Sequence, residues 1–381
     1  MKIAILGYGV VGSGAYEILT KNGYMVKKVL DIRPHNELGD VLTANYDDIL
    51  NDKEIGVVAE AIGGLEPAHT FVVKALKAKK CVVSSNKHLI CQYYDELHQL
   101  AKENGVTLRF TSAVGGGIPW LYNLKRTIKG DDVSKIMGIM NGTTNFILDA
   151  MISDGRDFDE VLKEAQALGY AEANPSADID GLDVARKTAI SSSIAFDTTV
   201  TESNVDIFSL RNITKNDIDY IREKLGKTVR YMGFGERNDN GTISTYVEPV
   251  ILPSDALEAS VSKNFNLISL FGKSVGRLSF YGQGAGKYPT GHALATDVID
   301  IVNGACEPCL LGNKIDVDNS MKERKYYIRT SASLSCDACS QEKLDSCNYI
   351  FTNKMKVSAM HSLAKSILES DPLAFFAGIE E

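Results

Sequence analysis

The start of the chain carries the pattern that most strongly constrains its fold. Lys2–Leu6 is a short apolar run of strand length, and it leads directly into Gly7–Gly12, which has the form G-x-G-x-x-G. A helical stretch follows, in which Ala15, Ile18 and Leu19 are apolar. In a dinucleotide-binding unit the glycines allow a tight turn, close approach of a pyrophosphate and close packing of helix on strand. The alternative is a glycine-rich turn in another kind of α/β protein.

An acidic residue lies at the distance expected for ribose binding. A second largely apolar run, Tyr24–Leu30, ends at Asp31, nineteen residues after Gly12. An acid at about this spacing binds the adenosine ribose in such units. Asp31 favours NAD, because its carboxylate would repel the 2′-phosphate of NADP. Arg33 favours NADP instead, because an arginine beside the ribose can accommodate that phosphate. The sequence therefore favours NAD and leaves NADP open.

Strand-like and helix-like segments alternate over the following residues. Val57–Ile62 is mostly apolar, a helix is expected over 67–79, and a further strand runs from Cys81 towards Lys87. This rhythm is typical of a parallel sheet with crossover helices. Ligands of such sheets bind at the carboxyl ends of the strands, where Lys87 falls. A lysine at a strand end is also commonly just solvated, so Lys87 alone does not establish a site.

The segment Gly169–Ile190 gathers acids and bases into a short run. Asp183 and Lys187 are four residues apart, so on a helix they share one face. One interpretation is an exposed ion pair, worth only about 0.3–0.5 kcal/mol. The other is a catalytic pair, because alcohol oxidation needs a group that takes the hydroxyl proton while a hydride leaves for a nicotinamide. A lysine can do this if its pKa falls towards neutrality.

Motifs along the chain then allow a comparison with a known family. GYGVVG, GGLEPA, SSNKHLI, AVGGGIP, GIMNGTTNFIL, GYAEANPSADIDGLDVARK and GQGAGKYPTG occur in this order. Together they resemble homoserine dehydrogenase, and the resemblance extends from residue 1 to about residue 303. NGTTN and GYAEANPSADIDGLDVARK are its most specific motifs. The resemblance implies NAD(P)-dependent interconversion of L-homoserine and L-aspartate 4-semialdehyde, a step towards threonine and methionine.

The resemblance also implies roles for individual residues. Lys187 matches the catalytic lysine, Lys87 a second active-site lysine, and Asp183 the acidic partner of Lys187. The residues expected to bind substrate are Glu172, Asp178, Gly142, Thr143 and Lys87. The residues expected to bind the cofactor are Gly7, Gly9, Val10, Val11, Gly12, Asp31, Gly63, Ser85, Asn86, Lys87, Gly286 and Thr290.

The chain departs from the family pattern near a second glycine-rich segment. Thr111 stands where the family usually has an acid, which in some members helps to hold a monovalent cation, Na⁺ or K⁺. The backbone carbonyls of that cation site match Val114, Gly116 and Ile118. Without the carboxylate ligand, cation binding stays open. Gln283 replaces a usual arginine, which we expect to alter cofactor contacts and not the reaction.

The expected fold class is α/β, with a discontinuous Rossmann domain and an α+β second domain. We expect residues 1–130 and 284–320 to form the dinucleotide-binding domain and 131–283 the substrate-binding and dimerisation domain. Residues 321–381 are expected to form a short irregular C-terminal tail, interpreted as a degenerate ACT-like module. The resemblance further implies a homodimer, formed through the sheet of the second domain.

Composition argues against several other classes of protein. The net charge of −8 argues against nucleic-acid binding, and no basic stripe is evident. No run of eighteen apolar residues predicts a transmembrane helix. The start of the chain fits a first Rossmann strand better than a signal peptide. We therefore expect a cytoplasmic protein that binds neither nucleic acid nor membranes.

Cysteines near the end of the chain leave three interpretations open. Cys306 and Cys309 form one C-x-x-C pair, and Cys336 and Cys339 form another. Four thiolates with this spacing could close a tetrahedral zinc site. Ordinary reduced thiols and redox pairing are the alternatives, because the family has no such zinc site.

The tail also contains a strand–helix–strand pattern. Lys325–Ser331 resembles the first strand of the ACT regulatory domain of many family members. Apolar residues at helical spacing over 357–367 predict a helix, and Leu373–Ile379 could be a last strand. The usual Pro-Gly turn after the first strand is missing, so threonine feedback through this tail is left open.

Two other functions compete with the homoserine dehydrogenase hypothesis. One is a different amino-acid or semialdehyde oxidoreductase on the same scaffold. The other is a non-catalytic NAD-binding sensor with the cysteine-rich tail as its interaction module. Lys87, Asp183 and Lys187 together speak against the first, because NGTTN and the acid cluster shape the substrate pocket. The presence of both lysines speaks against the second.

Overall fold

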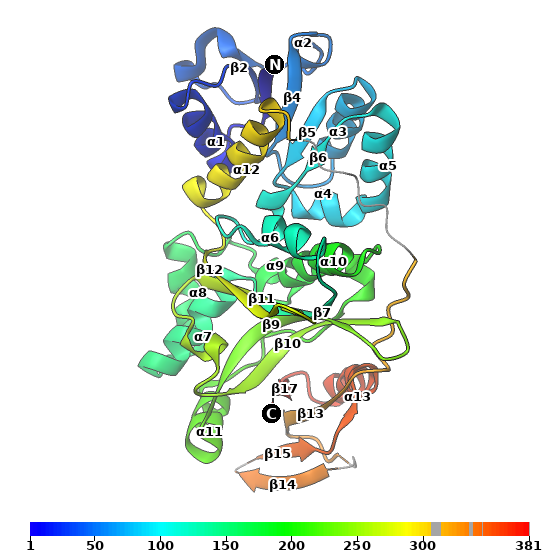
Figure 1. Cartoon of the computed structure of the whole chain (residues 1–381). Coiled ribbons are helices and arrows are strands. Elements are labelled where there is room, and N and C mark those ends of the chain that lie inside the picture. The colour runs from blue at the N-terminus through cyan, green and yellow to red at the C-terminus, as the bar shows by residue number, and fades with distance from the viewer. Residues whose placement is uncertain (306–313, 335–337, 345, 381) are drawn as a thin grey trace. The chain divides into compact units, whose positions relative to one another are not determined.

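The computed structural model describes residues 1–305, 314–334, 338–344 and 346–380, which form two compact units (Figure 1). Each unit has its own sheet. The first unit is made of Met1–Gly130, Ser193–Thr201 and Gly282–Lys314. The second unit is made of Asp131–Ser192, Glu202–Tyr281 and Ile315–Glu381.

The first unit is built on a parallel sheet with the strand order β3-β2-β1-β4-β5-β6. β1 pairs with β2 on one side and with β4 on the other, so the strand order reverses beside β1. Doubly wound folds bind ligands at such a switch point, and the expected Rossmann fold is confirmed. The strands are β1 (Lys2–Leu6), β2 (Val26–Leu30), β3 (Leu42–Thr43), β4 (Ile55–Glu60), β5 (Cys81–Ser84) and β6 (Leu108–Arg109).

A helix from a distant part of the sequence completes this unit. α12 (Lys287–Val302) packs against α1 (Val10–Lys21), as Figure 1 shows in yellow and blue. Two glycines permit the contact: a Cβ on Gly14 would lie 2.3 Å from the Lys287 carbonyl oxygen, and one on Gly291 would lie 2.9 Å from the Ala15 nitrogen. The other helices are α2 (Asp47–Leu50), α3 (Ala68–Lys77), α4 (Lys87–Gln92), α5 (Tyr94–Asn104) and α6 (Trp120–Thr127).

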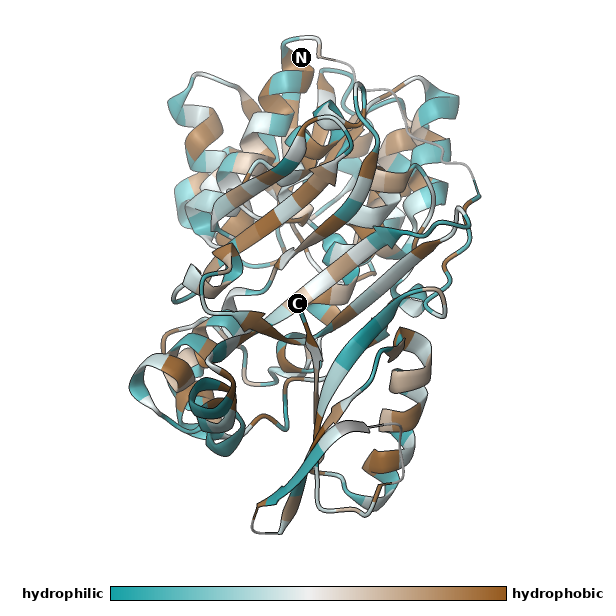
Figure 2. Cartoon of the chain, turned by 60° about the horizontal axis from the view of Figure 1, so that its bottom comes forward, coloured by the Kyte–Doolittle hydropathy of each residue, from teal (hydrophilic) through white to brown (hydrophobic). Residues whose placement is uncertain are grey.

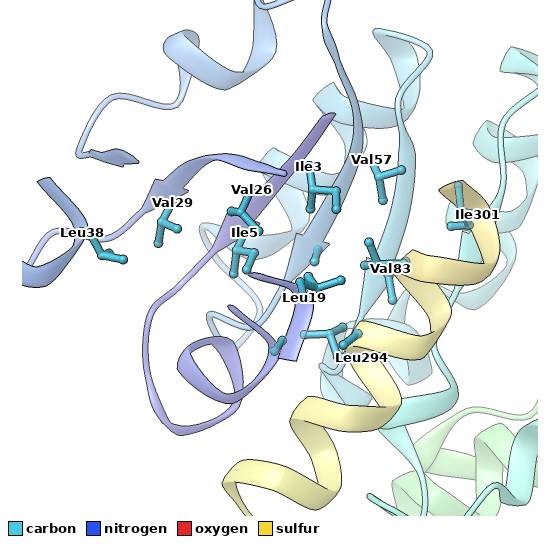
Figure 3. Close-up of a cluster of buried hydrophobic side chains, with 14 residues drawn as sticks. Ile3, Ile5, Leu19, Val26, Val29, Leu38, Val57, Val83, Leu294 and Ile301 are labelled. Carbon is cyan, nitrogen blue, oxygen red and sulfur yellow. The ribbon is translucent and has the colours of Figure 1, made fainter. Parts of the chain in front are cut away.

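The core of the first unit joins the sheet to α12. Figure 3 shows Ile3 and Ile5 of β1 with Val57 of β4 and Val83 of β5, close to Leu294 of α12. All five side chains are buried. The residues that α12 contributes to this core are Leu294, Ala295, Val298 and Ile301.

The second unit contains a largely antiparallel sheet with the order β12-β11-β7-β9-β10-β17-β13-β15-β14. β9 and β10 form its long central hairpin. Figure 2 shows hydrophobic residues recurring along the strands, alternating with lighter and polar ones. The strands before residue 300 are β7 (Val133–Ile139), β8 (Asp206–Ile207), β9 (Lys227–Arg237), β10 (Ile243–Pro253), β11 (Phe265–Gly272) and β12 (Gly276–Gln283). The helices are α7 (Gly142–Asp154), α8 (Phe158–Ala167), α9 (Ser176–Ile179), α10 (Leu182–Phe196) and α11 (Lys215–Leu225).

Helix α10 lies very close to strand β9. A Cβ on Gly233 would lie 2.1 Å from the Thr188 hydroxyl oxygen, and one on Gly235 would lie 2.3 Å from that of Ser192. A larger residue at either position would force these side chains to shift, because real Cβ contacts are longer than 3 Å. The glycines of β9 therefore allow α10 to bury one face against the sheet.

The expectation of an irregular C-terminal tail is wrong. The segment forms β13 (Glu323–Thr330), β14 (Ala338–Leu344), β15 (Cys347–Thr352), β16 (Met355–Lys356), α13 (Val357–Ser370) and β17 (Phe375–Ile379). β17 pairs in parallel with β10 and antiparallel with β13, so the segment continues the sheet of the second unit. Its order comes from a buried core, which includes Tyr326, Ile328 and Ile350 of the strands and Met360 and Ala364 of α13. We call β13–β17 with α13 the C-terminal module.

Individual elements of this module agree with the sequence. The predicted strand Lys325–Ser331 corresponds to β13, the helix over 357–367 to α13, and the strand Leu373–Ile379 to β17.

Among the described helices, none is both long and apolar enough to cross a membrane.

Candidate active site

Lys187 and Asp183 form a buried ion pair in the second unit. Both lie on α10, one helical turn apart, and the Lys187 Nζ donates to Asp183 Oδ2 at 2.8 Å. The Nζ also donates to the Met140 carbonyl oxygen at 2.7 Å. Lys187 is only 8% exposed and Asp183 only 5%. The interpretation as an exposed surface pair is therefore wrong, and the pair lies where electrostatic interactions are stronger than in water.

Asn141 connects this pair to a second acid. Its side-chain nitrogen donates to Asp183 Oδ2 at 2.8 Å and to Asp178 Oδ1 at 2.7 Å. Its side-chain oxygen caps α7 by accepting from the Thr144 nitrogen. Burial and the nearby Asp183 carboxylate raise the pKa of Asp178. Asn141 therefore holds two like charges together, a role that the sequence analysis did not assign to it.

The other predicted substrate residues lie on the same unit in different environments. The Thr143 hydroxyl donates to the Tyr170 carbonyl oxygen at 2.7 Å. A Cβ on Gly142 would lie 2.8 Å from the Asn264 carbonyl oxygen, so this position has room only for glycine. Glu172 is exposed, and its backbone carbonyl accepts from Gln166. The structure thus brings together Asp178, Asp183 and Lys187, while Glu172 stays at the surface.

The glycine-rich loop of the first unit has the geometry that dinucleotide binding requires. Gly7 has a φ of +91°, and a Cβ on it would lie 2.8 Å from the Ala61 carbonyl oxygen. A Cβ on Gly12 would lie 1.9 Å from the Gly7 carbonyl oxygen, so the turn closes only with glycine there. α1 begins at Val10, and its N-cap Gly9 has no side chain. The backbone N–H groups at the start of α1 can therefore approach a pyrophosphate closely.

Asp31, directly after β2, already accepts hydrogen bonds from Tyr8 and Arg33. Its carboxylate accepts from the Tyr8 nitrogen at 2.8 Å and from the Arg33 nitrogen at 2.9 Å. The Arg33 guanidinium donates to both carboxylate oxygens, at 3.1 and 3.0 Å. These bonds hold the pKa of Asp31 well below its usual range. Asp31 is buried, whereas the Arg33 side chain is 61% exposed, so the arginine is the more accessible partner for a ligand.

Glu60 links the two loops that follow β4 and β5. This fully buried carboxylate accepts from the Ile62 nitrogen at 2.8 Å and from the Ser84 hydroxyl at 2.5 Å. The Ser85 nitrogen donates to the Glu60 carbonyl oxygen, and the Asn86 side chain donates to the Gly64 carbonyl oxygen at 2.6 Å. Burial raises the pKa of Glu60. The sequence analysis missed Glu60, although its position at the end of an apolar strand is a usable signal.

These bonds define the positions of the predicted cofactor residues. Gly63 lies in the first of the two loops with a φ of +82°. Ser85 and Asn86 lie in the second loop, where the Asn86 side-chain oxygen caps α4. Lys87 is the first residue of α4, as expected for a group at the carboxyl end of a strand. Lys87 belongs to the first unit and Lys187 to the second.

The second glycine-rich segment is anchored by a carboxylate from α12. Asp297 accepts from the Thr111 nitrogen at 2.9 Å and from the Thr111 hydroxyl at 2.7 Å, and Arg109 lies 3.5 Å away. Burial raises the pKa of Asp297 to about 6. An acid therefore contacts position 111 although the sequence has threonine there. The predicted cation carbonyls belong to Val114, Gly116 and Ile118, which are all buried, and Gly116 is also tightly packed against Gly284.

The segment that leads into α12 contacts this region. The Gly117 nitrogen donates to the Gln283 carbonyl oxygen at 3.1 Å. Gly286, with a φ of +128°, is the N-cap of α12, and its carbonyl oxygen accepts from the Thr290 nitrogen. Gly286 and Thr290 thus start the helix that packs on α1.

The zinc hypothesis falls on a part of the chain that the structure does not describe. Cys306, Cys309 and Cys336 lie outside the described residues, as does the side chain of Cys339. Among the side chains that are described, no cluster of three or more His, Cys, Asp or Glu residues could hold a metal ion.

Comparison with known proteins identifies the family. The family model described as "Homoserine dehydrogenase, NAD binding domain" matches residues 7–111, and the model "Homoserine dehydrogenase" matches residues 119–299. A homoserine dehydrogenase of Bacillus subtilis is 38% identical over 79% of this chain and 73% of its own length. The chain belongs to the homoserine dehydrogenase family. It is therefore an oxidoreductase with an NAD(P)-binding domain.

Solved structures of homoserine dehydrogenases share the fold over all or most of this chain. The enzyme of Thiobacillus denitrificans matches with a TM-score of 0.89 at 29% identity, over 100% of this chain and 98% of the other. A hyperthermophilic archaeal homoserine dehydrogenase in complex with NADPH matches with a TM-score of 0.69 at 26% identity, over 81% of this chain and 99% of the other. The fold of both units is thus that of the family.

Proposed function

We propose that the chain interconverts L-homoserine and L-aspartate 4-semialdehyde, a step of threonine and methionine biosynthesis. The observation that carries the proposal is the buried Lys187–Asp183 pair, joined through Asn141 to Asp178. Such a cluster suits a substrate that has both a reacting hydroxyl group and an ammonium group. The names of the relatives support the same substrate.

Lys187 is proposed to move the proton of the substrate hydroxyl. Two of its three N–H groups are used by Asp183 and the Met140 carbonyl, which leaves one for the substrate oxygen. In the reduction, the ammonium gives this proton to the oxygen as the carbonyl carbon gains a hydride. In the oxidation, the neutral amine takes the proton back. The bound nicotinamide would supply or accept the hydride at the same carbon.

The acids and the second lysine are proposed to bind the rest of the substrate. Asp178 is half-buried and tied to Asn141, so its carboxylate is fixed in place for the substrate ammonium. Glu172 at the surface is proposed to assist when substrate binds. Thr143 is proposed to contact the same amino acid, and Lys87 is proposed to bind the substrate carboxylate.

An assay with alternative amino acids tests this function. The formation of NADH and NADPH is measured at alkaline pH with L-homoserine, L-serine and L-threonine as substrates. Alkaline pH favours the oxidation because the reaction releases a proton. We expect turnover with L-homoserine only. Turnover of another alcohol would indicate a different oxidoreductase, and cofactor binding without turnover would indicate a sensor.

We further propose that both NAD and NADP bind, with Arg33 as the residue that adapts. Arg33 can leave Asp31 to contact a 2′-phosphate, whereas NAD needs only the carboxylate of Asp31.

Arg33→Ala is expected to raise the KM for NADP by about tenfold or more, because one charge-assisted contact is lost. The KM for NAD is expected to change by less than about threefold. Arg33→Lys keeps the charge and serves as the comparison, and equal effects on both cofactors would contradict the proposal.

Four further predictions rest on the sequence and on the family resemblance. We propose a homodimer and a cytoplasmic location on that basis. A monovalent cation at the carbonyls of Val114, Gly116 and Ile118 stays a prediction, and zinc at the four tail cysteines stays one of three open interpretations.

A further inference from the structure

The short segment Phe208–Asn212 connects β8 to α11 and contacts the loop that carries Asp178. We call this segment the strap. The Leu210 nitrogen donates to the Ile179 carbonyl oxygen at 2.9 Å. The Ser209 hydroxyl donates to Asp180 Oδ1 at 2.9 Å. The strap therefore bonds to the two residues that follow Asp178.

Arg211 adds a two-point contact to the same loop. Its Nε donates to Asp180 Oδ1 at 3.0 Å, and its terminal nitrogen donates to Asp180 Oδ2 at 2.8 Å. The terminal nitrogen also lies 3.3 Å from the Ser176 hydroxyl at the start of α9. Bidentate contacts of this kind fix the direction of both groups. Arg211 thus holds α9 at both of its ends.

Helix α9 needs such support. It is a single turn, Ser176–Ile179, and isolated turns are unstable because nucleation fixes several residues for one hydrogen bond. Asp178 on this turn must keep its bond to Asn141 for the carboxylate to stay beside Asp183. The bonds from the strap therefore affect where the Asp178 carboxylate lies.

The opposite side of the strap is bonded to the C-terminal module. The Asn212 side chain donates to the carbonyl oxygens of Pro372 and Ala374, at 2.8 and 2.9 Å. Arg329 of β13 donates to the Asn212 carbonyl oxygen at 2.7 Å. The Phe208 ring stacks on the His361 ring of α13, with 3.6 Å between centroids. Both ends of the strap are thus fixed by the module.

The structure points to a positioning role for the strap. We propose that Arg211 is a positioning residue for substrate binding, and that Asn212 makes this position depend on the C-terminal module. The inference rests on the proposed function, because it assumes that Asp178 binds the substrate ammonium. A merely structural role would instead affect the whole unit. Half-exposed ion pairs such as Arg211–Asp180 stabilise a fold little, so effects on binding and on stability can be separated.

Kinetic constants of three variants test the proposal. Arg211→Met and Asn212→Ala are expected to raise the KM for L-homoserine by about tenfold, with kcat and the KM for the cofactor within about threefold of the wild type. Arg211→Lys should recover part of the loss because it keeps one charged contact. Arg222→Met is the matched control, because Arg222 on α11 is 48% exposed against 49% for Arg211 and pairs with Asp219. An unchanged KM for homoserine in the first two variants would overturn the proposal.

A measurement without substrate separates this inference from the proposed function. Hydrogen exchange of the amides over 176–181 is compared between the wild type and Asn212→Ala. We expect exchange to become faster there by about tenfold, with the unfolding midpoint unchanged. Equal exchange rates would overturn the coupling whether or not the wild type oxidises homoserine. A wild type that does not turn over homoserine, with faster exchange in the variant, would refute the proposed function and leave the coupling intact.

Discussion

Replacing Lys187 by alanine is expected to lower kcat by about 10²–10⁴-fold while binding of NAD(P) is preserved, because a positioned proton donor contributes this much to a rate. Lys187 lies in the second unit, away from the glycine-rich loop in the sequence, and its Nζ contacts Asp183 and the Met140 carbonyl. Steady-state rates with L-homoserine measure the loss. Fluorescence titration with NADH measures the cofactor affinity separately.

Lys163→Ala is the control for this experiment. Lys163 lies exposed on α8 in the same unit, so its removal takes away one positive charge without touching the buried pair. Its rate should equal that of the wild type. If Lys187→Ala turned over homoserine at the normal rate, the catalytic assignment of Lys187 would be wrong.

Replacing Asn141 by alanine is expected to lower kcat/KM by about 10²-fold and the free energy of unfolding by at least about 2 kcal/mol, because two carboxylates lose a shared donor. The bonds lost are those to Asp178 and Asp183 and the cap that accepts from the Thr144 nitrogen. Burial and Asp183 already raise the pKa of Asp178, and losing the donor would raise it further. Binding of the substrate ammonium requires the ionised form. The acidic limb of the kcat/KM profile should therefore move to higher pH.

Asn145→Ala provides a matched control on the same helix. Asn145 lies buried on α7, whose N-cap is Asn141, but its side chain donates to the carbonyls of Val261 and Lys263 and not to an acid. This variant should lose stability without shifting the pH profile. A profile that moved equally in both variants would show that the shift reflects general loosening of α7.

Local sequence patterns predicted the parts of the fold that depend on neighbouring residues. The G-x-G-x-x-G segment predicted the turn between β1 and α1, because Gly7 and Gly12 are needed by the backbone itself. The spacing of Asp183 and Lys187 predicted that they meet on one helical face. The family motifs placed the expected roles on residues that the structure does bring together, namely Asp178, Asp183 and Lys187.

Several features that depend on distant residues were not predicted. The burial of the Lys187–Asp183 pair accompanies close packing of α10 on β9, and that packing requires Gly233 and Gly235, which are some fifty residues away. Asn141 was recognised as part of NGTTN, but its bond to Asp178 depends on how α9 folds back. Sequence spacing carries no information about such contacts.

The C-terminal module shows the same limit on a larger scale. Its strand and helix patterns were visible, but the pairing of β17 with β10 joins Gly378 to Val250. No local signal specifies a partner at that distance. The segment was therefore expected to be irregular although its individual elements were recognised.

The return of α12 to the first unit has a consequence for biosynthesis. Residues 1–130 are synthesised first, but Leu294, Val298 and Ile301 cover part of their core. The apolar surface beneath α12 therefore stays open to water until the ribosome has passed the segments that build much of the second unit. Incomplete chains with open apolar surface are prone to aggregate. A slow codon between residues 131 and 286 would lengthen the period in which this surface is open.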